Sequence, residues 1–145
     1  MTFFEALFGS QYQEIKSKNG DIHKARFNGN LFLSAFVMIL VFTIIILLVT
    51  IFPELNKEFT KILKSIFGYS IGKTIGKLIA LPVLALIYLA VNLTLGNKNK
   101  FEIYIANFLL YSEEEKSKAN KIILKPFFIL LGIFFIVSML TLLKR

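Results

Sequence analysis

Few residues in this chain have the types and spacing that catalysis needs. His23 is the single histidine, and Asp21 lies two residues before it. Ser112 is a serine that we expect on the same side of the molecule as these two residues. A serine nucleophile has to be held on a sharp turn, and the chain has no nucleophile-elbow pattern. We therefore interpret His23 as a solvated loop histidine and expect no enzymatic activity.

The acidic run Glu113–Glu115 is a second group that could do chemistry, by binding Mg²⁺. However, Ser112 and Glu115 have the spacing of a capping box, and acidic side chains suit the positive N-terminus of a helix. The chain also has no cysteine, so no thiolate ligand is available. We therefore expect no metal and no cofactor. A lipid-modifying enzyme that uses these carboxylates is the least favoured of the three functions that we consider.

The segment Gly72-Lys73-Thr74 resembles the end of a phosphate-binding loop, but the pattern is incomplete. Such a loop requires another glycine at position 67, where this chain has Phe67; the nearest glycine is Gly68. No strand is predicted before it, and an apolar segment follows it. We therefore expect no nucleotide here.

Small residues recur every fourth position in the same stretch. This spacing lets two helix backbones approach closely, as in a glycine zipper. Each four-residue step turns the face by about 40°, so the stripe is short. It predicts either packing within the chain or an oligomer interface, and both readings remain open. The stripe consists of Gly68, Gly72, Gly76 and Ala80.

Three long uncharged segments are predicted to cross a membrane. Residues 31–52 form an unbroken uncharged run of 22 residues, which as a helix reaches about 33 Å, enough for a hydrocarbon core of about 30 Å. Residues 78–95 and 126–143 are also uncharged and extend backwards to about 75 and 122. We therefore predict three transmembrane helices, over about 31–52, 75–95 and 122–143.

No Asp, Glu, Lys, Arg or His lies within the uncharged runs of these spans. Ionisable groups inside a membrane mark proton relays and many transport sites, so their absence argues against a proton-coupled transporter and against an intramembrane enzyme. The strongest polar groups are Tyr88 and Asn92, one helical turn apart. They are candidates for a polar helix interface or a pore lining.

The connecting segments have amphipathic patterns. Thr2 and Glu5 fit a capping box for a short N-terminal helix over residues 1–8, which we expect to lie on the bilayer surface. Residues 54–67 and 101–121 are predicted to be amphipathic connectors. Asn19-Gly20 is a turn signal, and a hairpin in the polar segment around it is an open alternative. We expect lipid-headgroup contacts from Lys57, Lys61, Lys64, Lys73 and Lys77.

The basic residues flank the spans instead of forming one groove, so the net charge of +8 predicts contact with anionic headgroups and no nucleic acid. The N-terminal segment and the 96–125 loop together carry ten Lys and Arg, and the other side carries seven. This bias favours a cytoplasmic N-terminus. The excess of lysine over arginine, 15 against 2, is typical of AT-rich bacterial genomes and points to a bacterial inner membrane.

The sequence thus predicts an all-α integral membrane protein with three transmembrane helices and short amphipathic interfacial helices. Residues 1–30 form the N-terminal interfacial helix and polar segment, and residues 31–145 form the transmembrane domain. The favoured function is self-association into a homo-oligomer in the membrane. A channel, a pore and a membrane-perturbing assembly are the forms that such an oligomer could take. The alternative is an accessory or scaffold subunit that binds other membrane subunits.

Overall fold

The fold is described from a computed structural model that covers residues 1–52, 54–55, 57–58, 61–62, 65 and 73–143, with the backbone alone described for 73–80. All regular secondary structure in these ranges is helical, as the sequence predicts. The helices are α1 Phe3–Ser17, α2 Ile22–Ile51, α4 Lys73–Thr94, α5 Lys98–Leu110, α6 Glu113–Ser117 and α7 Ala119–Leu143.

The first two helices are joined by a tight turn. Asn19 adopts a positive φ of 51°, and the Gly20 amide donates to the Ile15 carbonyl at 2.9 Å, which closes the end of α1. The Asp21 carboxylate then accepts from the His23 amide at 2.9 Å and caps α2. The hairpin alternative is therefore wrong, because the turn signal at Asn19-Gly20 connects two helices. Helix α2 begins nine residues before the uncharged run.

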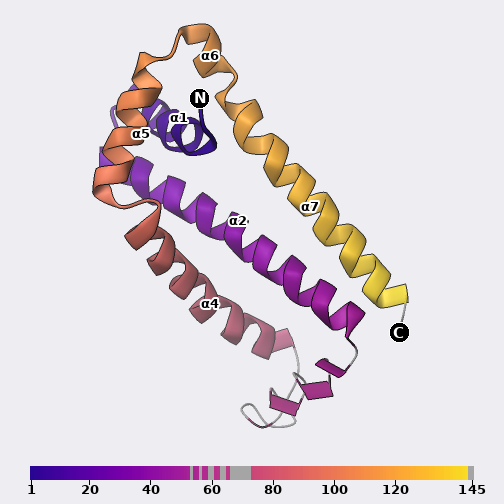
Figure 1. Ribbon diagram of the computed structural model, residues 1–145. Coiled ribbons are helices and arrows are strands. Elements are labelled where there is room, and N and C mark those ends of the chain that lie inside the picture. Colours follow the sequence, from indigo (N-terminus) through magenta and orange to yellow (C-terminus); the bar gives the residue numbers. More distant parts are fainter. Residues whose placement is uncertain (53, 56, 59–60, 63–64, 66–72, 144–145) are drawn as a thin grey trace.

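Helix α2 lies at the centre of the molecule and packs against both α4 and α7 (Figure 1). Two helical stretches are long and apolar enough to cross a membrane: α2 itself and the run Glu113–Leu143, which joins α6 to α7. A third candidate is the pair Leu81–Thr94 and Lys98–Leu110, which bends by 67°. The described part of the chain thus has two, or up to three, helices that are long and apolar enough to span a membrane.

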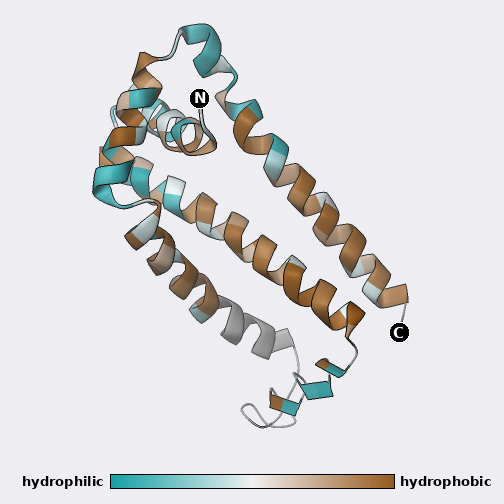
Figure 2. Ribbon diagram, in the orientation of Figure 1, coloured by the Kyte–Doolittle hydropathy of each residue, from teal (hydrophilic) through white to brown (hydrophobic). Residues whose placement is uncertain are grey.

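Polar and apolar residues are separated along the molecule. In Figure 2 the long helices α2 and α7 are apolar over most of their length, whereas hydrophilic residues gather at the end that carries α1, α5 and α6. The N-terminus lies at this polar end, and α7 finishes at the opposite end (Figure 1). A membrane would therefore enclose the long apolar helices and leave the α1–α5–α6 end at its surface.

The predicted connectors differ in how they are used. Helix α1 is twice as long as predicted, and its apolar face is buried by the protein itself instead of facing lipid. Phe8 is fully buried, stacked on Tyr104 with ring centroids 5.5 Å apart and edge-on to Phe101 of α5. The predicted apolar face of residues 101–111 is what covers it. In the predicted connector 54–67, the residues that the structure describes are helical.

Candidate functional site

A buried carboxylate ties α1 to α5. Glu5 is 7% exposed and completes the predicted capping box, since it accepts from the Thr2 amide at 2.7 Å. It also accepts from the Asn107 side-chain amide at 2.9 Å and from the Tyr111 hydroxyl at 3.1 Å. The sequence analysis identified the cap but not the two partners from α5 and its C-terminal end, because they lie about a hundred residues away.

These donors stabilise the charged form of the carboxylate. The hydrogen bond from the Thr2 amide, helped by those from Asn107 and Tyr111, lowers the pKa of Glu5 below its ordinary value, although burial opposes the change. The Glu5 side chain is thus an anion held by neutral donors. It can fasten the two helices together, and its low pKa makes it a poor general acid or base at neutral pH.

Two glycines outside the predicted stripe create close helix contacts at the same end. A Cβ atom at Gly9 would overlap the ring of Phe108 and lie 2.5 Å from the Phe108 Cβ. A Cβ atom at Gly29 would lie 2.5 Å from two ring carbons of Phe8. The absence of a side chain at Gly9 lets α5 approach α1, and its absence at Gly29 lets α1 approach α2. These glycines are separated in sequence, so no repeat signals them.

Asn92, a predicted polar-interface residue, takes part in a buried junction between α2 and the α4–α5 bend. The fully buried Asn30 donates from Nδ2 to Asn92 Oδ1 at 2.9 Å and to the Gly96 carbonyl at 3.2 Å. Asn30 Oδ1 has no hydrogen-bond partner among the described residues and lies against Gly96, where a Cβ atom would overlap it. The junction therefore holds the end of α4 on α2 and helps fix the bend. It connects helices of one chain.

Tyr88, the other predicted polar residue, makes an aromatic contact. Its ring lies 5.7 Å from that of Phe27 on α2, one turn away from the Asn30 junction. At the opposite end of the spans, the Thr50 and Thr141 hydroxyls are 2.6 Å apart and join α2 to α7. These four polar side chains thus make contacts between helices of the same chain.

The outward surface of α7 is an apolar feature that the described part of the chain leaves uncovered. Only 6% of the most apolar 18-residue window in the Glu113–Leu143 run is buried, against 17% in α2. In the middle of this surface is Gly132, where an added Cβ atom would meet nothing within 4 Å. Bulky exposed side chains surround it on the same face, namely Phe128, Phe135, Ile136 and Met139.

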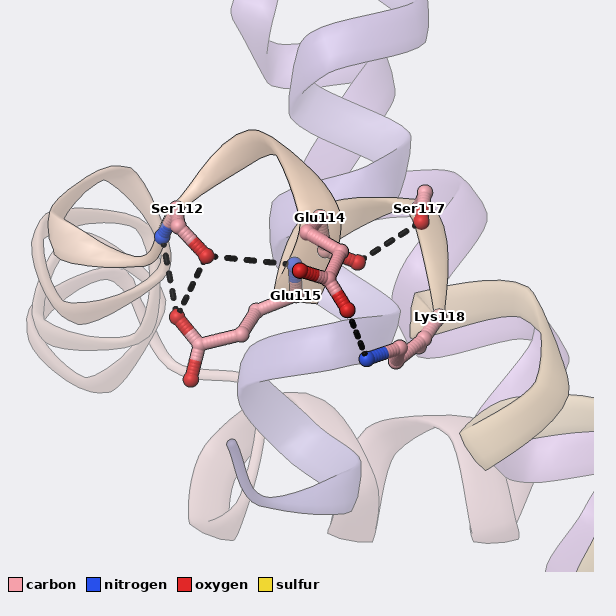
Figure 3. Close-up of polar contacts among 5 residues, drawn as sticks. All are labelled: Ser112, Glu114, Glu115, Ser117 and Lys118. Atoms are coloured by element: carbon pink, nitrogen blue, oxygen red, sulfur yellow. Dashed lines mark hydrogen bonds and ion pairs between the residues drawn. The ribbon is translucent and has the colours of Figure 1, made fainter.

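The acidic run functions locally as a helix start. Ser112 Oγ accepts from the Glu115 amide at 3.3 Å, and Glu115 in turn accepts from the Ser112 amide at 3.0 Å (Figure 3). Glu114 pairs with Lys118, four residues later, at 2.7 Å. The capping box and helix start predicted near residue 113 are confirmed. Within the described part of the chain, no three His, Cys, Asp or Glu side chains cluster as metal ligands would.

The remaining predicted site residues are only partly described. Gly68, Gly72 and Lys64 lie outside the described residues. Only the backbone, which belongs to α4, is described for Lys73, Gly76, Lys77 and Ala80. Lys57 and Lys61 are exposed. The glycine stripe and the full set of lysine contacts with lipid therefore stay predictions.

Comparison of the chain with protein-family models, with curated proteins and with solved structures finds no match. The class of protein is thus defined by the fold alone: an all-helical protein whose two, or up to three, helices long and apolar enough to span a membrane are consistent with a helical membrane protein, with a polar end built from α1, α5 and α6.

Proposed function

We propose that this protein is a small three-span membrane protein that self-associates, with copies packing through the outward face of α7. The observation that carries the proposal is Gly132. Glycine in a helix interior costs about 1 kcal/mol relative to alanine, yet its small size serves no contact with any residue that the structure describes. Small residues at membrane helix interfaces let a second backbone approach closely.

The side chains around Gly132 supply the rest of such an interface. Phe128, Phe135 and Ile136 are 58–62% exposed and rise on the same face, one turn before and one turn after the glycine. A partner helix would cross at the glycine and pack between these larger side chains. Dispersion and shape complementarity drive association inside a membrane, because lipid already satisfies the apolar surface.

The polar groups at membrane depth favour an assembly without an aqueous pore. The hydroxyls of Thr43 and Ser138 each donate to a backbone carbonyl four residues earlier in the same helix, and those of Thr50 and Thr141 lie within hydrogen-bond distance of such a carbonyl and of each other. A hydroxyl whose proton is used in this way offers water only its acceptor lone pairs. A conducting channel would need a polar wall from elsewhere in the chain.

An accessory subunit is the second candidate function, and the same observation supports it. The surface at Gly132, which lacks a side chain, would accept a helix of another membrane protein as readily as a helix from a second copy of this chain. The two functions differ in the composition of the purified complex. Self-association gives a mass that is a multiple of this chain, whereas an accessory subunit purifies with a different protein in a fixed ratio.

The test is the mass of the purified protein in mild detergent, by native mass spectrometry. We expect a discrete multiple of the 16.6 kDa chain for the wild type and monomer for Gly132→Leu. The matched control is Ala85→Leu, which adds a similar volume to an exposed position on α4. Gly72→Leu tests the glycine stripe in the same assay.

A monomeric wild type without a copurifying protein would overturn both functions. An oligomer that survives Gly132→Leu but not Gly72→Leu would move the interface from α7 to the predicted stripe. Loss of the oligomer in Ala85→Leu alone would place the interface on α4.

A further inference from the structure

A hollow of about 380 Å³ lies at the polar end of the molecule, between α2 and α5 and beside the middle of α1. Its floor is apolar: Phe101 and Ile105 are almost completely buried beneath it, and Ile22 and Leu109 are about half exposed at its edges. An apolar hollow that opens at the surface of a membrane protein is suited to a hydrocarbon chain.

Charged groups from two helices surround this floor. Arg26 comes from α2, and Lys98 and Glu102, one helical turn apart, come from α5. The other titratable groups at the hollow are His23 of α2 and Tyr12 of α1. None of the salt bridges between described residues involves Arg26, Lys98 or Glu102, which leaves both cations and the carboxylate available to a ligand.

The position of the rim along α2 places it at the level of lipid headgroups. Arg26 precedes the start of the uncharged run at Leu31 by five residues, which is about 7.5 Å of helix. The headgroup region on each side of a bilayer is about 5–8 Å thick. A guanidinium at this level can reach a lipid phosphate while the acyl chains extend toward the hydrocarbon core.

We infer that the hollow binds one phospholipid whose headgroup carries a phosphate next to an ammonium, as phosphatidylethanolamine does. Arg26 and Lys98 bind the phosphate, Glu102 accepts from the ammonium, and an acyl chain lies on Phe101 and Ile105. The carboxylate decides the headgroup, because Glu102 can pair with the ammonium, whereas the neutral glycerol of phosphatidylglycerol offers it no opposite charge. This lipid site goes beyond the proposed self-association and does not depend on it.

The experiment measures lipid retention by native mass spectrometry of the delipidated full chain. The probes are phosphatidylethanolamine, phosphatidylglycerol with the same acyl chains, and the free fatty acid. We expect phosphatidylethanolamine to bind best and Arg26→Gln to weaken its binding about tenfold, as the loss of a charge-assisted contact does. Glu102→Gln should reverse the preference toward phosphatidylglycerol.

Two matched controls separate the hollow from general lipid contact. Lys24→Gln removes one charge from an exposed position on α2 that does not line the hollow, and should leave retention unchanged. Ala106→Phe fills the hollow and should abolish specific binding, whereas Ala90→Phe adds the same ring to an exposed position of α4 and should not. All variants are compared at equal helicity by circular dichroism, so that misfolding is recognised.

Equal retention of the three probes, or retention that Arg26→Gln and Ala106→Phe leave unchanged, would overturn the proposal and mean that lipid only surrounds the protein. Preference of the wild type for phosphatidylglycerol or for the fatty acid would overturn it as well, because the role assigned to Glu102 would then be wrong.

Discussion

Replacing Gly9 by alanine should separate α1 from α5. The new Cβ atom would overlap the Phe108 ring and lie 2.5 Å from the Phe108 Cβ. Because the Cβ sits close to the backbone, a ring rotation cannot relieve the contact and the helix itself has to move. We place this overpacking at about 3 kcal/mol, the upper end of the usual range. Alanine regains about 1 kcal/mol of helix propensity, which leaves a net loss of about 2 kcal/mol.

The assay is thermal unfolding in mild detergent, followed by circular dichroism. A loss of about 2 kcal/mol lowers Tm by about 4–8 °C in a chain of this size. The matched control is Gly20→Ala, which lies outside the proposed interface and whose added Cβ would meet only Ile15, with its side chain nearest at 3.0 Å, so that Tm should fall less.

A double substitution tests the cause of the effect. In a Phe108→Gly background both the ring and the Phe108 Cβ are gone, so Gly9→Ala should cost less than about 1 kcal/mol. An unchanged Tm for Gly9→Ala, or an equal loss with and without the Phe108 ring, would refute the close contact between α1 and α5.

Three further predictions concern the polar end. The pKa of Glu5 is lowered in the folded protein, so its contribution to stability is present above the ordinary glutamate pKa of 4.5 and is lost as pH falls from there toward the lowered value; Tm should decline over that range, and less so in Glu5→Gln. Asn30→Ala leaves Asn92 Oδ1 and the Gly96 carbonyl without their donor and should cost about 1–3 kcal/mol, seen as increased hydrogen exchange at the α4–α5 bend; unchanged exchange would contradict the role of the junction. Gly20→Ala should cost less than Gly9→Ala, because the nearest atom to its Cβ would be the Ile15 side chain at 3.0 Å; a larger Tm loss at Gly20 would reverse this order.

The sequence was sufficient to predict the elements whose cause is local. A bilayer needs a long uncharged run, so the positions of α2, α4 and α7 follow from composition, within a few residues at most ends. The capping boxes at Thr2 and Ser112 were predictable for the same reason, since their donors and acceptors lie three residues apart.

The start of α2 was harder to predict. Residues 22–30 are polar and were treated as a loop, because hydropathy marks where a membrane begins and says little about where a helix begins. Asp21 caps the helix outside the membrane, and Ala25 and Gly29 bury that polar segment against the rest of the protein. Tertiary packing therefore stabilises the first part of α2, which hydropathy alone does not predict to be helical.

The sequence by itself determined which segments can enter a membrane, because the transfer of apolar residues into lipid depends on composition and length alone. Only the tertiary structure decided what the polar end does. Three contacts join residues that lie 62–102 positions apart in the sequence: Glu5 with Asn107, Gly9 with Phe108, and Asn30 with Asn92. No periodicity records such pairs, since they depend on how the helices are placed against one another in three dimensions.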